Sequence, residues 1–147
     1  MWRTASVWVM TLGDEVQVNG LVLPAELKCA LSDGRWSRLR SSPSLSDVFG
    51  SEAVRPRFYA LQSIVAINRD WKAETDEVYL GHANSYQHPG NIDPRRSLIV
   101  AELGPDQLIA LDYRDPTGPD VVFASDDVWS PWRRVAGSIA ELLAKLA

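Results

Sequence analysis

The chain has 147 residues, of which 46% are hydrophobic and 23% charged, and its formal net charge is −4. These values are ordinary for a globular domain with its own hydrophobic core, and the negative charge excludes a global positive field that would attract nucleic acid. No apolar run approaches the roughly 20 residues that cross a bilayer, and the one cysteine, Cys29, excludes an intramolecular disulfide framework. We therefore expect a single cytoplasmic domain over residues 1–147 that binds no membrane.

Two short strands are predicted near the start of the chain. Val7–Leu12 and Glu15–Val18 have the residues of strands, and Gly13-Asp14 between them fits a tight hairpin turn. Asn19-Gly20 then predicts a second change of direction.

A short helix is predicted next. Pro24 fits the first helical position, where its missing N–H costs nothing, and Gly34 suits the left-handed residue that ends a helix. Arg35–Arg40 alternates in a way that favours an edge strand, since charges on an edge discourage unwanted pairing. Asp47–Phe49 is expected to form a single helical turn.

The middle of the chain predicts one longer helix, Tyr59–Trp71. Its apolar residues lie mostly on one side of a helix; they are Leu61, Ile64, Val65, Ile67 and Trp71. Glu77–Leu80 is predicted to be a strand, and Gly81–Arg96 a long exposed loop, because glycine and proline recur in it.

The last third predicts a three-stranded antiparallel meander closed by a helix. Leu98–Ala101, Leu108–Leu111 and Val121–Ala124 are short apolar runs separated by clusters of glycine, proline and aspartate. Runs without strict alternation indicate strands covered on both faces. Ile139, Leu142, Leu143 and Leu146 then form one stripe of a helix, and Ser138 with Glu141 has the spacing of a capping box.

Catalytic and metal-binding motifs are weak in this sequence. His82 and His88 are the only histidines, and two residues in one loop fall short of the four ligands of a zinc site. Cys29 lies in the predicted first helix without a basic neighbour, which favours a buried small side chain over a nucleophile. Ser85 and Ser125 lack a nucleophile-elbow setting, and no glycine-rich phosphate loop is present. We expect no cofactor and no metal.

Two further clusters have a functional and a structural interpretation. Asp126-Asp127 offers two carboxylates, but adjacent strand residues point to opposite faces, so a solvated turn is the better interpretation. The arginines of Arg35–Arg40 flank Trp36 and would suit phosphate contact and base stacking. In a half of the chain with balanced charge this basic cluster is a weak signal, so we expect no direct nucleic-acid binding. Trp129 and Trp132 are expected in the core or covering it.

The acidic excess of the chain is confined to one segment. Between residues 97 and 132 there are seven acidic residues and one arginine, Arg114, which gives this segment a net charge of −6. Asp112, Asp115, Asp126 and Asp127 fall at the ends of predicted strands and are expected to gather along one rim. We predict that this rim steers a basic protein partner; a rim that only confers solubility is the alternative.

The order of several segments resembles the SUKH superfamily, which includes the Smi/Knr cell-wall assembly regulators and bacterial toxin-immunity proteins. The matching segments are Leu21–Leu27, Ser32-Asp33-Gly34, Leu108–Asp112, Gly118–Val122, Trp132 with Val135-Ala136, and Ser138-Ile139 with Leu142-Leu143. Together they resemble the family's "LP" helix entry, its "LALD" strand, its "G-P-V" turn, and the tryptophan that precedes its last helix. Asp120 departs from the pattern, as does the lack of a helical pattern before Leu21.

The resemblance implies a single SUKH-like α+β domain, an antiparallel sheet packed by a few short helices with an amphipathic helix at its C-terminus. It also implies a non-enzymatic binding protein, an immunity protein that neutralises a cognate toxin, for example one that cleaves nucleic acid. Two alternatives remain open. One is a regulatory scaffold of the cell-wall assembly type, and the other is a small hydrolase that uses Asp126, Asp127 or His82.

Overall fold

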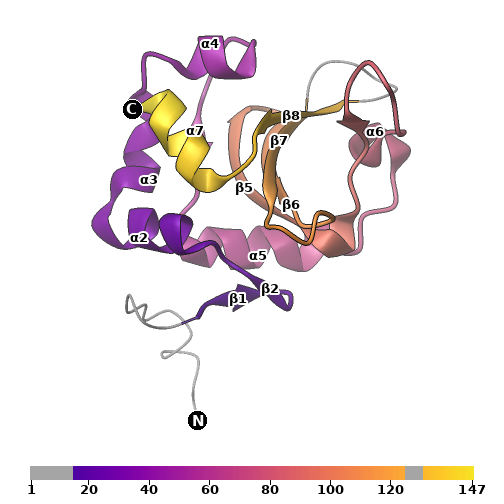
Figure 1. Ribbon diagram of the computed structural model, residues 1–147, viewed down its shortest axis with the longest axis horizontal. Coiled ribbons are helices and arrows are strands. Elements are labelled where there is room, and N and C mark those ends of the chain that lie inside the picture. Colours follow the sequence, from indigo (N-terminus) through magenta and orange to yellow (C-terminus); the bar gives the residue numbers. More distant parts are fainter. Residues whose placement is uncertain (1–14, 125–130) are drawn as a thin grey trace.

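A strongly curled antiparallel sheet forms the centre of the protein, whose computed structural model describes residues 15–124 and 131–147 (Figure 1). Within these ranges the sheet has six strands in the order β3-β5-β6-β7-β8-β4, and a separate hairpin pairs β1 with β2. The strands are β1 (Gln17–Val18), β2 (Leu21–Val22), β3 (Arg57–Phe58), β4 (Pro89–Gly90), β5 (Ser97–Gly104), β6 (Gln107–Asp112), β7 (Asp120–Ala124) and β8 (Trp132–Ala136).

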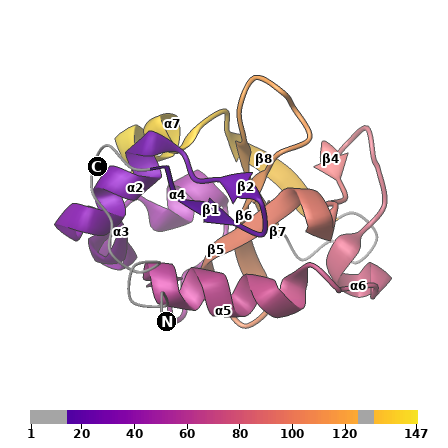
Figure 2. The same ribbon diagram turned by 90° about the horizontal axis from the view of Figure 1, so that it is seen from below.

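Short helices surround this sheet. They are α2 (Ala25–Asp33), α3 (Arg35–Arg38), α4 (Leu45–Phe49), α5 (Leu61–Trp71), α6 (Glu77–Leu80) and α7 (Ile139–Leu146), with the 3-10 turns η1 (Leu39–Ser41) and η2 (Pro94–Arg96). Figure 1 shows α2, α3, α4 and α7 gathered at one side of the sheet and α6 at the other, and Figure 2 shows α5 running along it from below. The predicted α+β fold, with a C-terminal helix on an antiparallel sheet, is confirmed.

The predicted meander is β5, β6 and β7, and each pair is antiparallel. Residues 97–101 of β5 and 109–112 of β6 are all buried. The apolar runs are thus covered on both faces, as their lack of alternation predicts. Asp112 at the end of β6 is the register partner of Asp120 at the start of β7, so these two carboxylates belong to the same end of the sheet.

The predicted C-terminal helix is confirmed as α7, which packs on β7 and β8 and contacts α2 and α4. The Ser138 hydroxyl accepts a hydrogen bond from the Glu141 amide at 3.1 Å, and the Glu141 carboxylate accepts one from the Gly137 amide at 3.1 Å. These two bonds satisfy amides that the first helical turn leaves without partners. Leu142 is fully buried, whereas Leu143 is half-buried, so the two leucines contribute unequally to the core.

Helix α5 attaches to the sheet through a buried asparagine. Asn68 is 0% exposed, and its side chain donates to the Ile99 carbonyl at 2.8 Å and accepts from the Ile99 amide at 2.7 Å. The pairing of β3 with β5 reaches only Ala101 and Glu102. Asn68 therefore replaces a strand partner at Ile99, where both backbone groups would otherwise be buried without one.

Two predicted strands are helices. Arg35–Arg40 forms α3 and η1: the Asp33 carboxylate accepts from the Arg35 amide at 3.0 Å, and a helix places Trp36 in the core against Phe58, with ring centroids 5.0 Å apart. Glu77–Leu80 forms α6 because the Asp76 carboxylate caps it, accepting from the Val78 amide at 2.9 Å. In α6 the Asp76 cap outweighs the strand pattern, whereas α3 has no side-chain cap bond and the burial of Trp36 favours the helix there.

The prediction that Gly81–Arg96 is an exposed loop is wrong in part. The segment contains β4, which pairs with β8, and Ile92 is only 4% exposed. Gly90 is buried with a φ of 80°, and a Cβ there would lie 2.5 Å from the His82 carbonyl oxygen. The absence of a side chain lets the segment fold tightly on itself, which a polar loop pattern does not reveal.

The outcomes at the N-terminus are mixed. The Asn19-Gly20 turn is confirmed, since it joins β1 to β2 and both residues have positive φ. The helix predicted at Pro24 is α2, with Pro24 as its N-cap, and Gly34 ends it in the left-handed conformation as predicted. The single turn at Asp47–Phe49 is the end of α4. The predicted strand Val7–Leu12 and its turn lie outside the described residues.

Candidate functional site

A pocket lies at the end of the sheet where β6 stops and β7 starts. Its volume is about 720 Å³, within the range typical of ligand sites. One wall is the folded segment from Ala83 to Asn91, and the other contains Asp112, Asp115 and Asp120 from the β6–β7 connection, with Arg134 from β8. We call this region the pocket end of the sheet.

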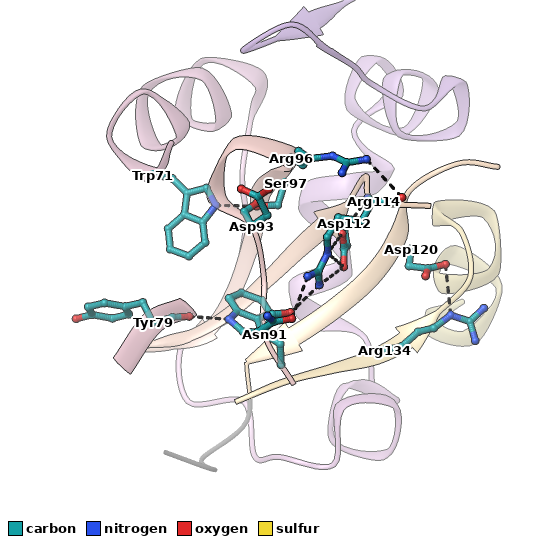
Figure 3. Close-up of polar contacts among 11 residues, drawn as sticks. Trp71, Tyr79, Asn91, Asp93, Arg96, Ser97, Asp112, Arg114, Asp120 and Arg134 are labelled. Atoms are coloured by element: carbon teal, nitrogen blue, oxygen red, sulfur yellow. Dashed lines mark hydrogen bonds and ion pairs between the residues drawn. The ribbon is translucent and has the colours of Figure 1, made fainter. Parts of the chain in front are cut away.

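Arg114 joins the two walls of this pocket. Its guanidinium donates to both carboxylate oxygens of Asp112, with Nη2 at 2.8 Å from Oδ2. The same group donates to the side chain of Asn91 at 2.9 Å and to the Asn91 carbonyl at 2.7 Å (Figure 3). One arginine thus neutralises a buried carboxylate and fixes the opposite wall, a use of the forked guanidinium that lysine does not reproduce.

A second arginine, Arg134, forms an ion pair with the second carboxylate, that of Asp120. Arg134 Nε lies 3.3 Å from Oδ1 of Asp120 (Figure 3). Because Asp112 and Asp120 are register partners, two like charges would face each other across the strands without this compensation. Two arginines therefore offset two of the three aspartates, and the pocket keeps a net charge of −1.

Asp115 supplies that remaining charge. Its Oδ1 accepts hydrogen bonds from the Thr117 amide at 2.9 Å and from the Thr117 hydroxyl at 2.7 Å. These bonds, with a smaller contribution from the charge of Arg134, lower the pKa of the Asp115 carboxyl. Within the described ranges no donor bonds its Oδ2. Asp115 is therefore a fixed anion with one oxygen available to a partner.

Hydrogen bonds from two tryptophans help to fix the wall that faces these carboxylates. Trp132 of β8 is fully buried and donates from its indole nitrogen to the Tyr79 carbonyl at 2.6 Å, which attaches α6 to the sheet (Figure 3). Trp71 donates to the Ser97 hydroxyl at 3.0 Å, and Ser97 donates to the Asp93 carbonyl at 2.7 Å. The pocket wall is thus held by a few polar bonds that begin in the core.

Two of the four predicted partner-binding residues lie at this site. Asp115 is exposed at the pocket, whereas Asp112 is only 7% exposed and is occupied by Arg114. Asp126 and Asp127 lie outside the described residues. Asp120 and Arg134 were missed, although the position of Asp120 at a strand start is a usable signal.

The candidate catalytic residues that the structure describes do not form a recognisable catalytic arrangement. His88 and Ser85 line the pocket, and His82 lies 3.5 Å from the Glu77 carboxylate. The lowered pKa of Asp115 suits a permanent anion and not a proton donor near neutral pH. Cys29 is half-buried, and Ser125 lies outside the described ranges. No group of three or more metal-ligating side chains occurs among the described residues.

The basic cluster of α3 and η1 lacks the platform that base stacking needs. Trp36 is 0% exposed and packs edge-on against Phe58. Arg35 is paired with Asp33 at 2.8 Å. Arginine charges remain at the surface there, but the aromatic ring between them is unavailable to a nucleotide.

None of the helices in the described ranges has the length and hydropathy required to traverse a bilayer. No family model matches the chain, and neither a curated protein nor a solved structure is significantly similar to it. The SUKH resemblance therefore stays a prediction.

Proposed function

We propose that this protein is a non-enzymatic binding protein of the immunity type, which neutralises a basic toxin by binding it at the pocket end of the sheet. The observation that carries the proposal is the pocket itself. It combines a cavity of about 720 Å³ with a carboxylate, Asp115, that is held as an anion and has an oxygen to which no described residue donates. A basic protein surface is the complement of such a site.

The placement of the family-like segments supports the same function. The strand Leu108–Asp112 ends at the pocket, and the Gly118–Val122 turn forms part of its rim. Trp132 holds the opposite wall, and Ser138 caps the helix that closes the core. Several of the segments that carry the resemblance thus contribute to the candidate site or its support.

In this mode of action the anionic surface first attracts the basic toxin, and the bound protein then covers the toxin's groove for nucleic acid. An anionic surface raises the association rate of a basic partner, and the effect weakens as salt screens the charges. A toxin that cleaves nucleic acid needs a positive groove for phosphates, and an anionic protein that covers this groove would block it. Neutralisation of this kind needs no catalytic residue in the immunity protein.

Co-expression tests the proposal directly. The chain is produced in cells together with the toxic domain encoded in a neighbouring reading frame, and growth and complex formation are measured. We expect growth to be restored and the two chains to co-elute as one complex. A complex without protection would indicate a scaffold, and the absence of both would refute the proposed function.

A further inference from the structure

Two carboxylates that line the pocket, those of Asp115 and Asp120, have spare acceptor capacity. Asp120 uses Oδ1 for Arg134, and Asp115 uses Oδ1 for Thr117, so each has a second oxygen without a bond in the part of the chain described. The charge of Arg134 acts on both. The Arg134 side chain is 56% exposed, so its ion pair with Asp120 is of the weak, solvent-screened kind.

An exposed aromatic residue stands beside this pocket. Tyr86 is 94% exposed, and its neighbours Asn84, Ser85 and His88 all line the cavity. The amide of Tyr86 donates to the Asn84 side chain at 2.6 Å. An exposed tyrosine next to a polar cavity is typical of the aromatic anchors at protein interfaces.

We propose that the pocket binds an arginine side chain of the protein partner, with the guanidinium at Asp115 and Asp120 and the aliphatic stem beside Tyr86. This inference rests on the proposed function and adds the chemistry of the partner's anchoring residue. A planar guanidinium has several donors at fixed angles and can bond two carboxylates at once, whereas an ammonium group acts as a point charge. An aromatic ring next to the stem adds apolar and cation–π contact.

The test uses the full chain, labelled with nitrogen-15, and N-acetyl-arginine methylamide as the probe. Amide chemical shifts are followed while the probe is added, and the citrulline and lysine derivatives are titrated in parallel. We expect saturable shifts at the amides of Asn84, Asp115 and Arg134, with a dissociation constant on the order of 1 mM for a ligand of this size. Lysine should bind more weakly, and neutral citrulline should not bind at this site.

Matched variants assign the effect to the two carboxylates. Asp115→Asn together with Asp120→Asn removes both charges and keeps an oxygen for the Thr117 bonds. Asp47→Asn together with Asp70→Asn removes the same charge from α4 and α5, where neither residue lines the pocket. The pocket variant should lose at least about tenfold in affinity for the probe, and the control variant should match the unmodified chain.

The outcomes separate this inference from the proposed function. Shifts that are absent from the pocket, equal for citrulline, or unchanged in the pocket variant would overturn the arginine site, even if the toxin complex forms. Arginine-specific binding without any toxin complex would leave the site standing and refute the immunity function. Tyr86→Ala should weaken binding of the probe further than Tyr86→Phe, because the phenyl ring keeps the contact with the stem.

Discussion

The meander with α7 and the segment from Glu77 to Arg96, which contains the pocket wall, both contribute strands to the same large sheet but are held by different interactions. The meander has long antiparallel strands, whose pairing is broken only by irregularities in β5, and most of its side chains are buried. The pocket wall has a two-residue strand and a few long-range polar bonds, chiefly those of Arg114 and Trp132. Damage to the meander should therefore unfold the whole domain, whereas damage to the wall should open the pocket alone.

The largest expected effect comes from the core of the first region. Leu142→Ala removes a fully buried side chain and should cost about 2–5 kcal/mol in the free energy of unfolding. Leu143→Ala, on the same helix but half-buried, should cost about 1 kcal/mol or less, because less apolar area is lost. Denaturant titration of both variants measures the difference, and equal losses would contradict the placement of α7.

The second prediction addresses the bond that joins the two pocket walls. Arg114→Gln leaves the Asp112 carboxylate buried with a single backbone donor, and it should cost about 1–3 kcal/mol. Adding Asp112→Asn to Arg114→Gln should recover part of that loss, because the uncompensated charge is gone. The double-mutant cycle gives the coupling energy, and strictly additive losses would mean that the pair is not coupled.

The third prediction compares two glycines with similar backbone conformations. Gly20 and Gly90 have φ values of 79° and 80°, but only at Gly90 would a Cβ meet backbone atoms. Both alanine variants pay about 1 kcal/mol for the left-handed conformation, and Gly90→Ala should cost more because the wall must shift. Hydrogen exchange should accelerate in residues 82–91 of the Gly90 variant and remain unchanged in β5 and β6. Faster exchange throughout the meander would contradict the prediction that damage to the wall leaves the meander intact.

The smallest effect concerns the cap of α7. Hydrogen bonds from Lys145 and from the Gly137 amide lower the pKa of Glu141 below 4.5 in the folded state. A carboxyl whose pKa is lowered by folding adds stability above its unfolded pKa, and that stability is lost as the pH falls through the folded pKa. The melting temperature of Glu141→Gln should lie slightly below that of the unmodified chain near neutral pH and approach it below about pH 4. A difference in melting temperature that stays constant at all pH values would show that the charge of Glu141 does not contribute to stability.

The contrast between the two regions also explains what the sequence predicts. The meander, α7 and the Gly34 cap depend on local periodicity and turn residues, and all three are predicted. The sequence did not predict β3, which has only two residues, or β8, which contains two arginines. In β8, Arg133 lies 5.5 Å from the Phe123 ring and donates to the Phe49 carbonyl. Such contacts are with residues distant in the chain, so no local pattern encodes them.

Asn68 and the pocket are two further features that local sequence patterns predict only in part. Asn68 lies in the buried stripe of α5 with Leu61, Ile64 and Trp71, and a polar residue in such a stripe indicates a buried hydrogen bond. Which strand it bonds cannot be deduced from the helix alone. The acidic excess of residues 97–132 predicts an anionic surface. It does not reveal that Arg114 and Arg134 neutralise Asp112 and Asp120, or that Asp115 has no ion-pair partner among the described residues.

The rate of association with the partner found by co-expression tests the binding role of the pocket end most directly. The rate constant is measured at low and high salt for the unmodified chain, for Asp115→Asn with Asp120→Asn, and for the control Asp47→Asn with Asp70→Asn. We expect the pocket variant to associate roughly tenfold more slowly at low salt, with a weaker dependence on salt, while the control stays close to the unmodified chain. Equal rates for the two variants would show that the partner binds another face.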